Sequence, residues 1–192
     1  MANLSNKKLI IIAAVIAVVV IMLLWVVFAY SGIVDNEQKV NSAGSQIKNR
    51  YTTKLSVLSE LEPELRGFAQ YESSLLTNIT SLRSQWTNAI SSGASTDELA
   101  NISAGVDDTF ATLYAVYENY PDLDYSAHVS QYMGEIVDLN EQLSYSRSQY
   151  NDAVQEYNSG IKSFPMMMFA GAWGFEEREY WGEQLTGDGS NL

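Results

Sequence analysis

The chain has 192 residues, a formal net charge of −12, no cysteine and a single histidine, His128. Without cysteine there can be no disulfide, thiolate metal site or cysteine nucleophile, and one histidine excludes a histidine-rich metal site within one chain. The acidity would be repelled by nucleic-acid phosphates, so we expect no nucleic-acid partner.

One long apolar segment lies near the N-terminus. Residues 9–30 contain no charged side chain, and as a helix these 22 residues would span about 33 Å, close to the hydrocarbon thickness of about 30 Å. Three aromatic residues lie near its far end, as in an interfacial belt: Trp25, Phe28 and Tyr30. The segment is therefore predicted to be a transmembrane helix with the lipid bilayer as its partner.

The charges on either side of this segment predict its orientation. Lys7 and Lys8 precede it, whereas acids follow it, so the positive-inside rule places residues 1–8 in the cytoplasm and the following domain outside the cell membrane. A cleaved signal peptide is the alternative. It is disfavoured because the apolar run is longer than an h-region of about 7–15 residues.

The chain after the anchor shows helical periodicity in three segments. In the first, apolar residues recur at intervals of three, four and seven over residues 40–90. Pro63 interrupts this pattern and predicts a kink or a break near residues 59–63. The Ser-Gly pair at Gly93 is expected to end the segment.

The second and third segments continue the same pattern. Thr96 is the expected N-cap of a helix whose apolar stripe covers residues 99–120, and Pro121 stops it. The third stripe covers residues 125–164. No segment alternates with period two, so we predict an all-α chain: an N-terminal transmembrane helix, then an antiparallel bundle or coiled coil of three to four helices at residues 34–185, and a disordered tail at 186–192.

Two charged residues interrupt otherwise apolar stripes. Glu72 fills a gap in the first stripe and Arg147 fills one in the third. A lone buried charge is costly, whereas a paired one can fix helix register. The two residues are therefore either partners across the bundle or both reach solvent at the edge of the seam.

Residues 150–165 have the specific pattern YNxxVxxYNxxIxxFP, and three other distinctive blocks precede it in order: residues 34–38, residues 51–72 and residues 118–123. Together these blocks resemble the LemA family. The resemblance implies a single-pass membrane protein with an extracytoplasmic helical domain, and it implies no enzyme class.

The resemblance also has departures among the polar residues of these blocks. Where the family carries paired arginines, this chain has Thr53 and Lys54. The family has an acid seven residues before the arginine that corresponds to Arg147, where this chain has Asn140. It has a histidine before the glutamate that corresponds to Glu72, where this chain has Tyr71. The polar network of the family is therefore thinned in this chain.

No motif for catalysis, a metal or a cofactor is visible. A hydroxyl–histidine–acid triad would depend on His128, which is expected on the surface of the third helix. The acidic clusters at Asp107-Asp108 and at Glu60, Glu62 and Glu64 are expected to be solvated helix faces, because they lack the turn glycine of a calcium loop. We therefore expect no enzyme, and an extracytoplasmic hydrolase is only a remote alternative.

The segment after the third stripe is rich in methionine, aromatic residues and glycine. It either caps the open end of the bundle or forms an adaptable contact surface. Its proposed contact residues are Phe164, Met166, Met167, Met168, Phe169, Trp173, Phe175, Tyr180 and Trp181. The leading hypothesis is a membrane-anchored scaffold that forms a homo-oligomer or organises envelope proteins. The alternative is an adaptor that docks one membrane or envelope partner through residues 164–181.

Overall fold

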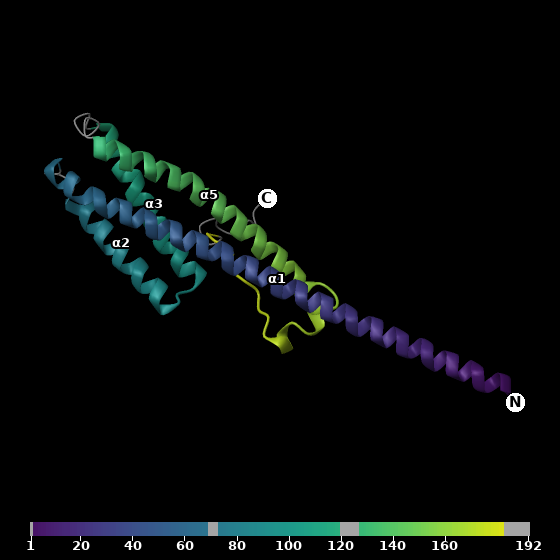
Figure 1. The fold of residues 1–192 in the computed structure, drawn as a ribbon. Coiled ribbons are helices and arrows are strands. Elements are labelled where there is room, and N and C mark those ends of the chain that lie inside the picture. Colours follow the sequence, from purple (N-terminus) through teal and green to yellow (C-terminus); the bar gives the residue numbers. More distant parts are fainter. Residues whose placement is uncertain (1, 69–72, 120–126, 183–192) are drawn as a thin grey trace, which may run out of the picture. The chain divides into compact units, whose positions relative to one another are not determined.

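The computed structural model describes residues 2–68, 73–119 and 127–182. These residues form four α-helices and no strand: α1 (Ala2–Phe68), α2 (Ser73–Ser92), α3 (Thr96–Asn119) and α5 (Ala127–Lys162) (Figure 1). Two short 3-10 helices follow, η1 (Met166–Met168) and η2 (Gly171–Trp173). The prediction of an all-α fold that begins with a long apolar helix is confirmed.

The chain divides into two compact units. We call Met1–Val40 with Ala153–Arg178 the anchor unit, and Asn41–Asp152 with Glu179–Leu192 the bundle unit. Both α1 and α5 run through the division without a break. The predicted tail at residues 186–192 lies outside the described residues.

The bundle unit is formed by four helices, and successive helices run antiparallel (Figure 1). Each helix buries the apolar stripe that its period of 3.6 residues creates. Its most deeply buried large side chains include Ile47, Leu55, Leu58, Leu61, Ile79, Trp86, Leu99, Leu113, Val106 and Ile136. Trp86 also donates its indole N–H to Thr52 Oγ1 at 3.0 Å, so the ring is buried with its polar atom satisfied.

Two helix boundaries differ from those predicted. A kink or a break was predicted near residues 59–63, and the break is wrong, because α1 continues through Pro63 to Phe68. Proline removes one backbone donor, and the helix nevertheless continues with Leu61 fully buried two residues before it. The N-cap of α3 is Ser95 and not Thr96, because Ser95 Oγ accepts from the amide of Glu98 at 3.2 Å.

The turn between α2 and α3 agrees with the sequence. α2 ends at Ser92, and Gly93 has φ +70°, which favours glycine. Ala94 then donates its amide to Ala89 O at 2.9 Å, which satisfies a carbonyl of the last helical turn.

In the anchor unit, α1 carries the apolar segment. It is the one helix among the described residues that is long and apolar enough to cross a membrane, and none of its most apolar 18-residue window is buried. Its length and composition indicate a membrane anchor. Farther along, α1 packs closely on α5, since a Cβ on Gly160 would lie 2.5 Å from Ile33 Cδ1.

Candidate functional site

Five polar residues from three helices meet inside the bundle unit. Tyr51 and Lys54 lie three residues apart on α1, Asn140 and Arg147 lie seven apart on α5, and Asp107 lies on α3. These spacings place each pair on one face of its helix. We call these five residues the ionic network.

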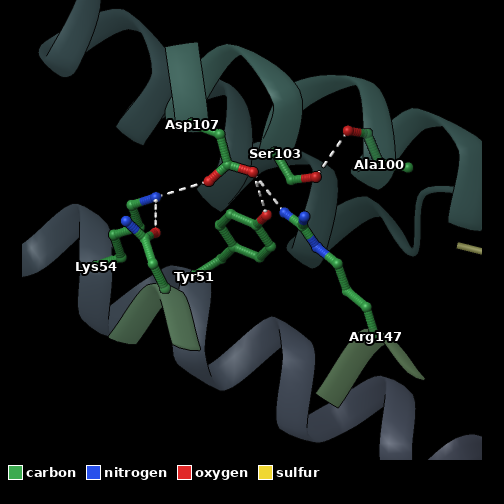
Figure 2. Close-up of polar contacts among 7 residues, drawn as sticks. Tyr51, Lys54, Ala100, Ser103, Asp107 and Arg147 are labelled. Carbon is green, nitrogen blue, oxygen red and sulfur yellow. Dashed lines mark hydrogen bonds and ion pairs between the residues drawn. The ribbon is translucent and has the colours of Figure 1, made fainter. Parts of the chain in front are cut away.

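Asp107 is the centre of the ionic network (Figure 2). Its Oδ1 accepts from Lys54 Nζ at 2.6 Å, and its Oδ2 accepts from Tyr51 Oη at 2.9 Å and from Arg147 Nη2 at 2.5 Å. Lys54 Nζ also donates to Asn140 Oδ1 at 2.6 Å. One carboxylate on α3 therefore binds α1 and α5 at once.

Burial dominates the electrostatics of this group. The Lys54 side chain has no solvent exposure, whereas about a third of Asp107 is exposed (33%). Burial lowers the pKa of Lys54 and raises the pKa of Asp107, and in each case their mutual attraction opposes the shift without overcoming it. Desolvation therefore disfavours both charged forms, and the pair specifies the helix arrangement more than it stabilises it.

Aromatic faces surround the two cations. Lys54 Nζ lies 5.0 Å from the ring centroid of Phe110 and 6.0 Å from that of Tyr51. The guanidinium carbon of Arg147 lies 5.4 Å from the Tyr51 centroid. These contacts offset part of the cost of removing the cations from water.

A pocket of about 240 Å³ opens beside the ionic network. Its lining residues are Lys54, Asp107, Phe110, Asn140, Leu143 and Arg147. Two cations face one carboxylate in it, and Arg147 Nε is buried without a hydrogen-bond partner. Among the described residues, no three histidine, cysteine or carboxylate side chains gather as a metal site would require. With three donors on Asp107, the arrangement is suited to holding helices in register.

The sequence prediction found only part of this network. Arg147 does have a carboxylate partner, but the one that the structure shows is Asp107. The predicted partner Glu72 lies outside the described residues. The prediction that Asp107 belongs to a solvated face is wrong, because it lies four residues after buried Ser103 and three before buried Phe110, on the core side of α3. That spacing is the sequence signal that could have placed Asp107 on the buried face of its helix. Asp108, by contrast, is exposed.

Two asparagines of the YNxxVxxYN pattern bind the chain that follows α5. In the bundle unit, Asn151 Oδ1 accepts from the Trp181 amide at 2.8 Å and its Nδ2 donates to Trp181 O at 3.4 Å. In the anchor unit, Asn158 makes the same two bonds with Arg178, both at 2.9 Å. We call these pairs the asparagine clamps.

The spacing of the asparagines suits this role. The two asparagines lie seven residues, or about two turns, apart and therefore on one face of α5, where Asn158 binds Arg178 and Asn151 binds Trp181. No sequence pattern predicts a role for these asparagines, because an apolar stripe predicts helix packing and gives no information about side chains that bind backbone groups outside helices. The tyrosines beside them, Tyr150 and Tyr157, are buried.

The predicted contact residues of the C-terminal segment fall into three groups by their exposure. Met166 and Trp181 are buried, so they contribute nothing to an exposed contact surface. The Trp181 ring stacks on that of Tyr51 with an interplanar angle of 12°. Phe169, Phe175 and Tyr180 are half-buried. The exposed members are Phe164, Met167, Met168 and Trp173. His128 is exposed in the first turn of α5, where the sequence placed it.

Comparison with known proteins gives relatives of two kinds. Protein LemA of Metamycoplasma hominis is 26% identical over 141 residues, which cover 71% of this chain and 63% of that protein. Magnetosome protein MamQ 2 of Paramagnetospirillum magneticum is 29% identical over 90 residues, or 47% of this chain and 33% of that protein. MamQ of Magnetospirillum gryphiswaldense is 26% identical over 96 residues, or 50% and 35%.

The chain thus spans about a third of the length of these magnetosome relatives. The model of the LemA family matches residues 43–187, a range that contains the whole ionic network and both asparagine clamps. On the extent of that match, the chain belongs to the LemA family.

Proposed function

We propose that the protein is a single-pass membrane scaffold whose helical bundle lies outside the cytoplasm and associates with itself or organises envelope proteins. The observation that supports this most is the continuity of α1, which holds both the apolar segment and the first core stripe of the bundle. A helix of the membrane is thus also a helix of the bundle. The names of the magnetosome relatives favour association with a cellular structure.

The ionic network supports a structural role over a catalytic one. Asp107 accepts from three residues, and a carboxylate held in this way is a poor general base because its lone pairs are occupied by donors. The network instead binds three helices to one carboxylate, which favours a bundle of defined register on which assembly can depend.

Orientation can be tested with a single introduced thiol, because the chain has no cysteine. Tyr145 is 64% exposed on α5, so Tyr145→Cys should react with a membrane-impermeant maleimide in intact cells. Lysed cells are the control for reactivity. Labelling that appears only after lysis would show that the bundle is cytoplasmic.

Self-association is tested on the full-length protein in detergent. Light scattering and particle imaging should show regular assemblies larger than one chain. A monomer at every protein concentration would contradict the self-associating scaffold and would leave the adaptor as the better hypothesis. The adaptor is favoured by the exposure of Met167 and Met168, and it requires one specific partner that is captured with the wild-type protein and lost when both methionines are replaced by serine.

A further inference from the structure

Two uncharged stretches of the anchor unit lie against each other. Residues 9–34 and residues 163–175 contain no charged side chain. The Phe164 ring lies 5.2 Å from that of Trp25, and the Tyr30 ring lies 5.3 Å from that of Trp173 and 5.6 Å from that of Phe175. The segment after α5 therefore packs along the last turns of the apolar part of α1.

The position of these contacts along α1 gives their depth in a bilayer. If the hydrocarbon begins at Leu9, about 30 Å of helix is roughly 20 residues and ends near Phe28. Trp25 then lies about 4.5 Å inside the boundary, and Tyr30 about 3 Å outside it. Phe164 shares the depth of Trp25, whereas Trp173 shares the headgroup depth of Tyr30.

Several large apolar side chains of the segment remain exposed. In η1, Met166 is buried at 2% exposure, while Met167 and Met168 are 62% and 67% exposed. Phe164 and Trp173 are 55% and 42% exposed. If the segment only capped helices, it would turn these groups inward, because exposed apolar area of this density is unfavourable in water.

Charged residues border the segment on both sides. Lys162 and Glu177 form an ion pair of 2.7 Å at its two ends, and both side chains are mostly exposed. Glu176 and Glu179 add further negative charge. These groups favour water and mark the aqueous limit of the segment, and their acidity gives no attraction to anionic headgroups.

We propose that residues 164–175 are a second membrane contact, a short insertion that enters the leaflet beside α1. Met167 and Met168 occupy the edge of the hydrocarbon, and Trp173 lies among the headgroups, where its ring is favoured. The occupant of this surface is lipid. The inference depends on the membrane anchor of the proposed function and is independent of self-association.

The test uses the full-length protein in phosphatidylcholine vesicles with one introduced cysteine that carries an environment-sensitive fluorophore. Met168→Cys reports on the insertion, and Met167→Cys repeats the measurement at a second exposed site. Gln155→Cys, exposed on α5 of the same unit, is the control in water, and Val15→Cys is the control inside the membrane. Lipids with a nitroxide near the headgroup end of the acyl chain should quench the probes at residues 167 and 168 several-fold more than the probe at 155. Adding anionic lipid should not strengthen that quenching.

Three results would overturn the proposal, and they differ from one another. Probes at 167 and 168 that behave like the one at 155 would place the segment in water. Probes shielded from water but unquenched by any nitroxide lipid would show a protein contact, as self-association through this segment requires. An unquenched probe at Val15 would remove the anchor, and the proposed function would fail with it.

Discussion

Lys54 Nζ lies 2.6 Å from Asp107 Oδ1, and the lysine side chain has no contact with solvent. The two residues are not equivalent. Asp107 retains two other donors and some water when the lysine is removed, whereas Lys54 without Asp107 would keep only the neutral amide oxygen of Asn140. The cost of breaking the pair should therefore depend on which partner is lost.

Replacing Asp107 should be far more damaging than replacing Lys54. Asp107→Leu leaves a buried cation without a counter-charge and should lower the free energy of unfolding by about 3–5 kcal/mol. Lys54→Met should cost clearly less, and the double variant should recover much of the loss. Urea unfolding of all three measures this. The matched control is Asp108→Asn, at an exposed neighbouring position, and an Asp107→Leu variant as stable as this control would refute the central role of Asp107.

The lowered pKa of Lys54 predicts a dependence on alkaline pH. The folded protein releases the Lys54 proton at lower pH than the unfolded chain, whose lysine keeps its ordinary pKa of 10.5. Between the lowered pKa and 10.5 the unfolded chain binds more protons, so this group adds stability as pH rises. The free energy of unfolding of the wild type, minus that of Lys54→Met, should increase from pH 7 to pH 10. A difference that is constant over this range would mean that burial does not shift the lysine.

Asn140→Asp should stabilise the bundle. An aspartate would put a second carboxylate 2.6 Å from Lys54 Nζ, and a hydrogen bond to a charged acceptor contributes about 1 kcal/mol more than one to an amide. It would also neutralise the excess positive charge of the ionic network and raise the pKa of Lys54. Thermal unfolding measures the gain. Asn49→Asp, which adds the same charge at an exposed site on α1, should change little, and an equal effect of both variants would assign the gain to net charge.

The asparagine clamps should control the C-terminal segment locally. Asn158→Ala removes two hydrogen bonds and leaves the amide and carbonyl of Arg178 unpaired, which should cost about 1–3 kcal/mol. Hydrogen exchange at Arg178 should accelerate before the helices open, and proteolysis near residue 178 should follow. Ser159→Ala, at the exposed next residue, is the control. Equal protection of Arg178 in both variants would show that the clamp is dispensable.

The sequence predicted the helical parts of the fold well, for a physical reason. Apolar residues spaced for one helix face must be buried somewhere, and residues such as Ile47, Val106 and Ile136 are buried where their stripes required. The end of α2 at Gly93 followed from backbone conformation alone. Structural features with a local cause, such as helix stripes and helix ends, could therefore be predicted from the sequence.

Structural features that depend on residues from elsewhere in the chain could not be predicted from the sequence. Pro63 predicts a kink or a break from local rules, yet α1 continues through it, with Leu61 buried nearby. The spacing of Asp107 along α3 indicates its core side, but it does not identify the partners Lys54 and Arg147 on α1 and α5. The same holds for Asn151 and Asn158, whose partners are backbone groups of a segment outside the helices, where no periodicity can be detected.

The stacking of Trp181 on Tyr51 has a practical consequence for deletion mapping. Tyr51 also donates its hydroxyl to Asp107, so Trp181 packs on a member of the ionic network. A truncated protein that lacks residues from 179 onward would lose this packing, which would let water reach Tyr51. Reduced assembly after such a truncation would then result from hydration of the bundle interior. It would be a mistake to interpret it as the loss of a binding site in the removed segment.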